Sequence, residues 1–144
     1  MKVIKLPKFA HAVQAGFPSA ADDFIEAQLD LNEHLIEHPS ATYLARAQGS
    51  SMKDQGIFNN DTLIVDRARE AEHGDIVVAA LDGELTCKIL DKQRRLLLPA
   101  NNAMRPVPIG DNSELIIEGV VIHSIRHHIR QDRKQRSKTN RQTT

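Results

Sequence analysis

The chain has 144 residues, enough for one ordinary domain with a hydrophobic core but too few for two large ones. Its formal net charge is zero, so the overall charge does not point to nucleic acid or an acidic membrane as a partner. The single cysteine, Cys87, excludes an internal disulfide, and no apolar run approaches the roughly 18 residues of a membrane span. The basic N-terminus lacks the apolar region of a signal peptide, so we expect a soluble cytoplasmic protein that makes no membrane contact.

The first 40 residues contain two different patterns. Residues 1–15 have no strong period and include Pro7, so we expect an extended, weakly anchored arm. Gly16-Phe17-Pro18 signals a turn, and Ser19 with Asp22 three residues later is typical of a helix N-terminus. The apolar residues that follow are spaced to predict a helix that packs on the core, with a break near residues 30–32 as an alternative, and ends at Pro39. They are Phe24, Ile25, Leu29, Leu31, Leu35 and Ile36.

Beyond Pro39 the sequence consists of short apolar runs separated by Gly, Asp and Asn, a pattern typical of strands. Asp82-Gly83 separates two of these runs and predicts a tight hairpin, because that turn needs positive φ angles. We therefore predict a mainly β body of several short antiparallel strands. The expected strands are Thr42–Ala47, Thr62–Val65, Asp75–Leu81, Glu84–Leu90, Leu96–Pro99 and Leu115–Ile125.

The C-terminal residues differ in charge from the rest of the chain. From Arg126 onward, seven lysines and arginines stand against one aspartate, and this charge of +6 leaves −6 for the preceding residues. Such asymmetry is typical of an interaction arm, and also of a solvated end without a specific partner. Few apolar residues follow Arg126, so residues 127–144 are predicted to form a disordered basic tail.

Ser51 is the first candidate for chemistry, because it lies in a polar loop just before a turn and a strand. A serine nucleophile needs a base, and no histidine has the spacing or the carboxylate neighbour that would make it one. The histidines also show no metal-binding spacing, and we expect neither a metal nor another cofactor. They are His11, His34, His38, His73, His123, His127 and His128.

Lys88 is the alternative base, because it lies within an apolar strand candidate. A lysine can activate a serine if its pKa falls by about 3 units from 10.4, and burial produces shifts of that size. In the competing interpretation Lys88 points outward from an edge strand and only discourages aggregation. Cys87 would lie on the opposite face of the strand, where core packing is a better interpretation than reactivity.

Several segments in order resemble the LexA/UmuD family of self-cleaving serine–lysine proteins. They are Gly49-Ser50-Ser51-Met52-Lys53-Asp54, Gly56-Ile57, Asp61-Thr62-Leu63-Ile64-Val65-Asp66, Gly74-Asp75-Ile76-Val77 and Asp82-Gly83-Glu84-Leu85-Thr86-Cys87-Lys88. The resemblance runs from Ala15-Gly16 to about Ile125. It implies that Ser51 is the nucleophile and Lys88 the general base, and that the backbone N–H groups of Ser50 and Ser51 form an oxyanion site.

The family cuts itself at an Ala-Gly or Cys-Gly bond ahead of the body, and Ala15-Gly16 matches that bond. A bond with almost no side chain can enter a narrow site, and glycine allows unusual backbone conformations. The resemblance thus divides the chain into a cleavable arm at 1–15, a peptidase body at 16–126 and the basic tail at 127–144. Alanine at the cut, and a tail beyond the family's usual end, are departures from the UmuD pattern.

The 15 residues before Gly16 are too few for the DNA-binding module of a LexA-type repressor, so the UmuD-like branch fits better. That branch implies a homodimer that takes part in SOS mutagenesis. Cleavage would be stimulated by a RecA filament on single-stranded DNA, and the product would join a UmuC-like Y-family polymerase in translesion synthesis. The basic tail could contact DNA. A non-catalytic binding module and a peptidase that acts in trans are the alternatives.

Overall fold

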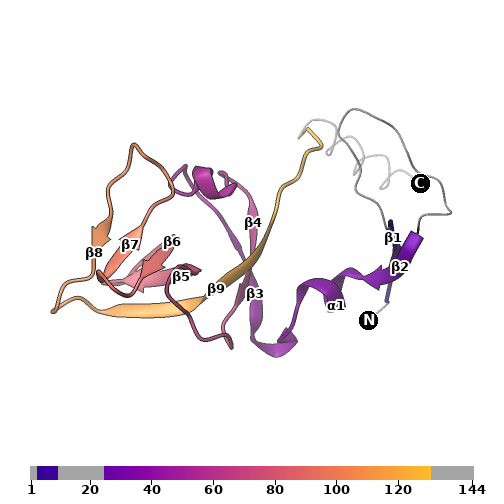
Figure 1. Ribbon diagram of the computed structural model, residues 1–144, viewed down its shortest axis with the longest axis horizontal. Coiled ribbons are helices and arrows are strands. Elements are labelled where there is room, and N and C mark those ends of the chain that lie inside the picture. Colours follow the sequence, from indigo (N-terminus) through magenta and orange to yellow (C-terminus); the bar gives the residue numbers. More distant parts are fainter. Residues whose placement is uncertain (1–2, 10–24, 131–144) are drawn as a thin grey trace, which may run out of the picture. The chain divides into compact units, whose positions relative to one another are not determined.

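The computed structural model describes residues 3–9 and 25–130 (Figure 1). The Ala15–Gly16 bond, the turn at 16–18, the proposed helix start at Ser19 and residues 131–144 lie outside the described residues. The chain separates into two compact units, residues 1–40 and residues 41–144.

The first unit contains a two-stranded antiparallel sheet in which β1 (Lys5–Phe9) pairs with β2 (Ile25–Asp30). A short helix, α1 (Leu31–Leu35), follows, and the Asp30 side chain caps it by accepting a hydrogen bond from the Asn32 N–H. The prediction of a helix over residues 25–30 was therefore wrong. Apolar residues at 25, 27 and 29 alternate there with polar residues at 26, 28 and 30, which is the two-residue period of a strand. The arm includes a paired strand, because its residues 5–9 find a partner in β2.

The second unit is a seven-stranded antiparallel sheet, which confirms the mainly β prediction (Figure 1). Its strands lie in the order β3-β4-β9-β5-β6-β7-β8. All six predicted strands are present, and within this unit the two-residue β8 is the one strand that was not predicted, since it is too short to show a period. The strands are β3 (Thr42–Arg46), β4 (Thr62–Asp66), β5 (Ile76–Leu81), β6 (Glu84–Asp91), β7 (Leu96–Leu98), β8 (Val107–Pro108) and β9 (Leu115–Ile125). Short 3₁₀ turns occur at Pro39–Ala41 and Lys53–Gln55.

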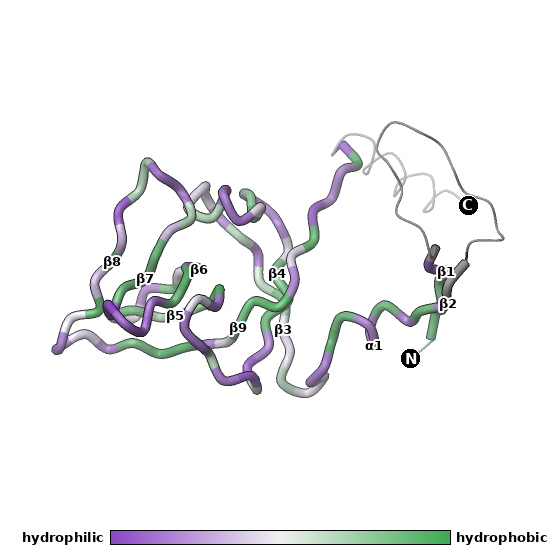
Figure 2. The backbone as a smooth tube through the Cα atoms, in the orientation of Figure 1, coloured by the Kyte–Doolittle hydropathy of each residue, from purple (hydrophilic) through white to green (hydrophobic). Residues whose placement is uncertain are grey.

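The core of the second unit consists of two apolar clusters joined by β9, which pairs with both β4 and β5. Most of β9 carries the green of hydrophobic residues in Figure 2. The first cluster lies beside the Ser51 loop and contains Ala47, Met52, Ile57, Leu63, Val65 and Ala100. The second contains Ala71, Val77, Ala79, Leu90, Leu97 and Val120. The Ser51 loop is therefore attached to a packed core.

The hairpin between β5 and β6 forms as predicted. Asp82 and Gly83 have φ angles of 50° and 84°, as a tight turn of the favoured hand requires, and Leu81 pairs with Glu84. The turn sets the register of β6, in which Thr86 and Lys88 lie on one face because side chains alternate along a strand. The hairpin thus determines which face of the sheet presents Lys88.

Gly119 occupies a bulge in β9, and its replacement by alanine is expected to destabilise the fold. Its φ is 155°, and a Cβ there would lie 2.5 Å from Val65 Cγ1 and 3.2 Å from the Asp66 carbonyl oxygen. Overpacking of this kind costs about 2 kcal/mol in the free energy of unfolding, measured by urea denaturation. Gly110→Ala is the control, because a Cβ at Gly110 meets only Ser113 Oγ, at 3.2 Å. Equal stability of the two variants would contradict the prediction.

Among the described residues, no helix has the length and apolar content needed to cross a membrane.

Candidate active site

Ser51 lies in the loop that connects β3 to the turn at Lys53–Gln55, and the core holds this loop in place. Met52 is 3% exposed and packs in the first apolar cluster. Its carbonyl oxygen accepts hydrogen bonds from the N–H groups of Gln55 and Ile57, at 3.0 and 3.3 Å. Gly56 ends the turn with a φ of 77°, a conformation that favours glycine. The methionine next to the serine therefore anchors the loop.

The segment that follows β7 supports the same loop through its backbone. The Ala100 N–H donates to the Ser51 carbonyl oxygen at 2.7 Å, and the Asp54 N–H donates to the Ala100 carbonyl oxygen at 2.9 Å. The Asn101 side chain donates to the Ser50 carbonyl oxygen at 2.9 Å. The loop is thus held on both sides of Ser51.

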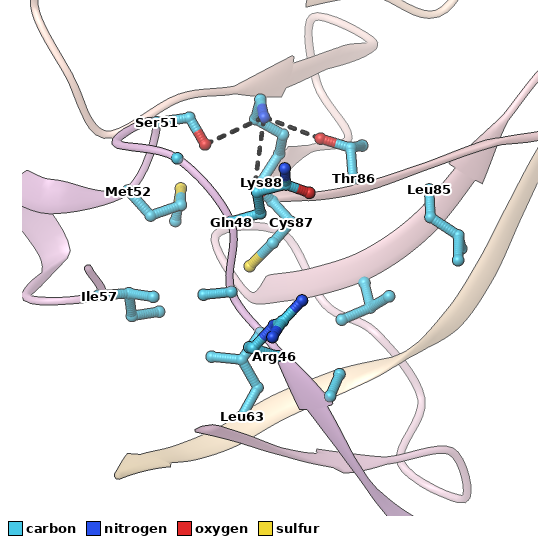
Figure 3. A pocket seen from close by; sticks show the side chains of 14 residues that line it. Arg46, Gln48, Ser51, Met52, Ile57, Leu63, Leu85, Thr86, Cys87 and Lys88 are labelled. Atoms are coloured by element: carbon cyan, nitrogen blue, oxygen red, sulfur yellow. Dashed lines mark hydrogen bonds between the residues drawn. The ribbon is translucent and has the colours of Figure 1, made fainter. Parts of the chain in front are cut away.

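Lys88 on β6 reaches Ser51, and Figure 3 shows its amine between two hydroxyl groups. Lys88 Nζ lies 3.2 Å from Ser51 Oγ, 2.8 Å from Thr86 Oγ1 and 3.3 Å from the Cys87 carbonyl oxygen. A neutral amine has two N–H donors and one lone pair. The carbonyl can only accept, so donation to Cys87 and Thr86 leaves the lone pair for the Ser51 hydroxyl.

Burial changes the pKa values of both Lys88 and Cys87. Partial desolvation lowers the pKa of the Lys88 amine, because burial disfavours its charged form. The same effect raises the pKa of the Cys87 thiol to about 11, so it stays protonated near neutral pH. The Cys87 sulfur points away from the amine in Figure 3 and packs against the first apolar cluster. Of these two groups, the Lys88 amine is therefore the one that can accept a proton from Ser51.

A small pocket opens beside the Ser51–Lys88 pair, with a volume of about 350 Å³. Residues 45–49 and residues 85–88 line the pocket, with Met52 beside Ser51 and Ile57 beyond Met52 (Figure 3). The first of these segments carries small side chains at Ala45, Ala47 and Gly49 and the longer ones of Arg46 and Gln48, and Leu85 adds an apolar surface that is 68% exposed. A pocket of this volume can hold a short peptide segment.

Ser51 and Lys88 lie together, although they are far apart in the sequence. Within residues 3–9 and 25–130, the backbone N–H groups of Ser50 and Ser51 have no hydrogen-bond acceptor. Ala15 and Gly16 lie outside the described residues. Within the part of the chain that the structure describes, no histidine lines the pocket, and His73 instead accepts a hydrogen bond from the Lys92 N–H elsewhere.

Sequence reasoning missed two residues that contact the site, Thr86 and Asn101. Thr86 precedes Lys88 by two positions on a strand, so their shared face was a usable signal. Asn101 carried no such signal, because its contact with Ser50 spans 51 positions and depends on how the segment after β7 folds back.

Arg126, the first residue of the basic C-terminal run, connects the end of β9 to the loop that follows Ser51. Its guanidinium contacts both carboxylate oxygens of Asp61, at 3.0 and 2.9 Å, and donates to the Gly56 carbonyl oxygen at 2.7 Å. It also lies 4.0 Å from the centroid of the Phe58 ring, a cation–π arrangement. Asp61 is 3% exposed, and the hydrogen bonds from Arg126 lower its pKa.

Arg126→Met is expected to lower the melting temperature by several degrees, because it leaves the buried Asp61 carboxylate without its cation. The lowered pKa means that this stabilisation is present above about pH 3.9 and is lost as the pH falls through the pKa of folded Asp61. Thermal unfolding followed by circular dichroism at pH 7 and at pH 3 measures both effects. Arg105→Met at an exposed arginine is the control, and an equal loss in that variant would count against the prediction.

The chain also matches proteins of known family. The Peptidase S24-like family matches residues 7–122. Protein ImpA of Salmonella typhimurium is 46% identical over 127 residues, which cover 83% of this chain and 82% of that protein. Protein MucA of Escherichia coli is 42% identical over 129 residues, 88% of each chain. The LexA repressor of Xylella fastidiosa is 39% identical over 120 residues, 82% of this chain and 56% of that repressor. The chain therefore belongs to the S24-like peptidase family, as a UmuD-like member of its self-cleaving LexA/UmuD group.

Proposed function

We propose that Ser51 is the nucleophile and Lys88 the general base with which this protein cuts its own Ala15–Gly16 bond. The observation that carries the proposal is the 3.2 Å separation of Lys88 Nζ from Ser51 Oγ, with the amine's other two contacts made to Thr86 and Cys87. The lowered pKa of Lys88 supports it, because a larger fraction of the amine is neutral near physiological pH.

In the first step, neutral Lys88 takes the proton of the Ser51 hydroxyl as Oγ bonds to the carbonyl carbon of Ala15. The carbonyl oxygen becomes an oxyanion, which the N–H groups of Ser50 and Ser51 would stabilise. As the tetrahedral intermediate collapses, the carbon–nitrogen bond breaks and the Lys88 ammonium returns the proton to the Gly16 nitrogen. Residues 1–15 are then esterified to Ser51.

In the second step, water releases the arm. Lys88 removes a proton from a water molecule while the oxygen of that water attacks the ester carbon. The Lys88 ammonium then gives the proton to Ser51 Oγ as the ester bond breaks. The arm leaves with a free carboxylate at Ala15, and the body begins at Gly16. Because enzyme and substrate are one chain, tethering supplies effective molarities of about 10⁵ to 10⁸ M in well-oriented cases.

The size of the pocket supports the choice of bond. Its volume of about 350 Å³ can hold an Ala-Gly segment, and the lining segment of residues 45–49 carries small side chains at Ala45, Ala47 and Gly49 beside the larger Arg46 and Gln48. Gly16 also allows a backbone conformation that other residues avoid.

In the cell, the protein would act in the cytoplasm as a homodimer in SOS mutagenesis. A RecA filament on single-stranded DNA would stimulate cleavage, and the shortened product would serve a UmuC-like Y-family polymerase. The identity of 46% to Protein ImpA and 42% to Protein MucA supports this role. The basic tail after residue 126 would add a DNA contact that weakens with salt.

Mass spectrometry of the purified protein tests the proposed bond. Incubation at alkaline pH, or with a RecA filament, should yield a 15-residue peptide ending at Ala15 and a body beginning at Gly16. Gly16→Val should slow the reaction, and Gly110→Ala should not. A cut at another bond would overturn the assignment of Ala15–Gly16.

Two rival functions give different results. A peptidase acting in trans would cleave added Ala-Gly peptides after processing, and it would cut Ser51→Ala protein mixed with the active form. A non-catalytic binding module would support damage-induced mutagenesis equally well with Ser51→Ala.

A further inference from the structure

The Ser50 carbonyl oxygen is held by a side chain that the catalytic steps do not use. It accepts hydrogen bonds from Asn101 Nδ2 at 2.9 Å and from the Lys53 N–H at 3.3 Å. Asn101 is 8% exposed, and its other side-chain atom, Oδ1, accepts from the Ala103 N–H at 2.9 Å. A carbonyl can only accept and an N–H can only donate, so the orientation of the amide is determined by its partners.

This contact fixes the direction of the Ser51 N–H. The described chain has no cis peptide bond, and in a trans peptide the C=O of one residue and the N–H of the next point in opposite directions. Holding the Ser50 carbonyl on Asn101 therefore aims the Ser51 N–H the other way. The Ser51 carbonyl is held in turn by the Ala100 N–H at 2.7 Å. Two adjoining residues thus orient the peptide groups on both sides of the Ser51 Cα.

We propose that Asn101 is a positioning residue that aims the Ser51 N–H at the oxyanion of the self-cleavage reaction. This inference rests on the proposed function, since it assigns a role within the same site. Within the described residues that N–H has no acceptor, so it is free to bind the oxyanion. Donors in an oxyanion site work only when they are already oriented before charge develops. Asn101 supplies that orientation from outside the pocket, because it does not line it.

Two substitutions distinguish this role from the alternative that Asn101 only stabilises the turn at residues 101–104 through its contact with the Ala103 N–H. Asn101→Asp keeps an oxygen that can accept from the Ala103 N–H, but it replaces the donor to Ser50 with an acceptor. Asn101→Ala removes both contacts. Asn102→Ala, at the exposed neighbour, is the matched control. Self-cleavage of the full chain is measured across pH, and the plateau above the pKa of Lys88 is compared.

We expect the plateau rate to fall by about 10- to 100-fold in both Asn101 variants, as a misaligned oxyanion donor would cause. Asn102→Ala should cleave at the wild-type rate. The pH midpoint should stay unchanged in Asn101→Ala, because Lys88 keeps its three contacts. The carboxylate added in Asn101→Asp can move the midpoint upward, and the plateau removes this effect from the comparison.

The rate at which iodoacetamide alkylates Ser51→Cys protein tests whether the Ser51 loop keeps its structure. A collapsed loop would change this rate, whereas a misdirected Ser51 N–H would not. The sulfur displaces iodide in one step, so the reaction needs a deprotonated thiol at the position of Ser51 and needs no oxyanion site. Peptide mass spectrometry distinguishes this thiol from Cys87. We expect equal alkylation rates in Ser51→Cys with and without Asn101→Ala, a substitution that removes the contact to Ser50 and adds no charge near the thiol.

The outcomes are distinct. Reduced cleavage with unchanged alkylation supports the positioning role. Wild-type cleavage in both Asn101 variants, an equal fall in alkylation, or loss of the folded state in both would overturn it. The proposed function fails separately, if Ser51→Ala protein still cleaves itself.

Discussion

Self-cleavage is expected to fall by about 10⁴-fold or more in both Ser51→Ala and Lys88→Met, the loss typical of removing a member of a catalytic pair. Ser51→Ala leaves the reaction without an attacking oxygen. Lys88→Met keeps the length and packing of the side chain but removes the only base within 3.2 Å of Ser51 Oγ among the described residues. Because the two groups act as a unit, the double variant should be no slower than either single one. Rates are measured by gel electrophoresis of intact and shortened protein.

Ser124→Ala and Lys53→Ala are the matched controls for these variants. Both side chains are exposed, and neither lines the pocket. They should cleave at the wild-type rate. Persistent cleavage in Ser51→Ala would exclude the serine mechanism, and persistent cleavage in Lys88→Met would require another base.

The rate of self-cleavage is expected to rise about tenfold per pH unit and then level off above the pKa of Lys88. Only the neutral amine can take the serine proton, so the rate follows the deprotonated fraction. Burial lowers this pKa, so the plateau should begin below the ordinary value of about 10.4. Rates between pH 6 and pH 11 give the midpoint. Nuclear magnetic resonance of the Lys88 amine in intact Ser51→Ala protein gives the pKa independently.

Stability provides a second measurement of the same pKa shift. Between its folded and its ordinary pKa, Lys88 binds more protons in the unfolded chain, so its contribution to the free energy of unfolding rises with pH across that window. The raised pKa of Cys87 acts in the opposite direction in both variants. The contribution of Lys88 is therefore the difference between Ser51→Ala and Ser51→Ala combined with Lys88→Met, and this difference should grow with pH. A pH-independent cleavage rate, or a midpoint at or above the ordinary pKa, would contradict a buried base.

Strand positions in the second unit could be predicted because each one depends on neighbouring residues. The alternation of apolar residues and the Asp82-Gly83 turn are local features, and the six predicted strands formed within one or two residues of their expected ends. The same reasoning failed at residues 25–30. The helix was predicted from apolar spacing over the longer run 24–36, whereas residues 25–30 by themselves alternate with the period of a strand and pair with β1.

The sequence offered Ser51 and Lys88 as candidates, and their pairing as nucleophile and base was implied by the resemblance of several ordered segments to the LexA/UmuD family. Three-dimensional packing alone brings Lys88 within reach of Ser51. It also carries Asn101 to the Ser50 carbonyl and Arg126 to Asp61. These contacts join residues up to 65 positions apart. Sheet register and core packing set such distances, and no local pattern encodes them.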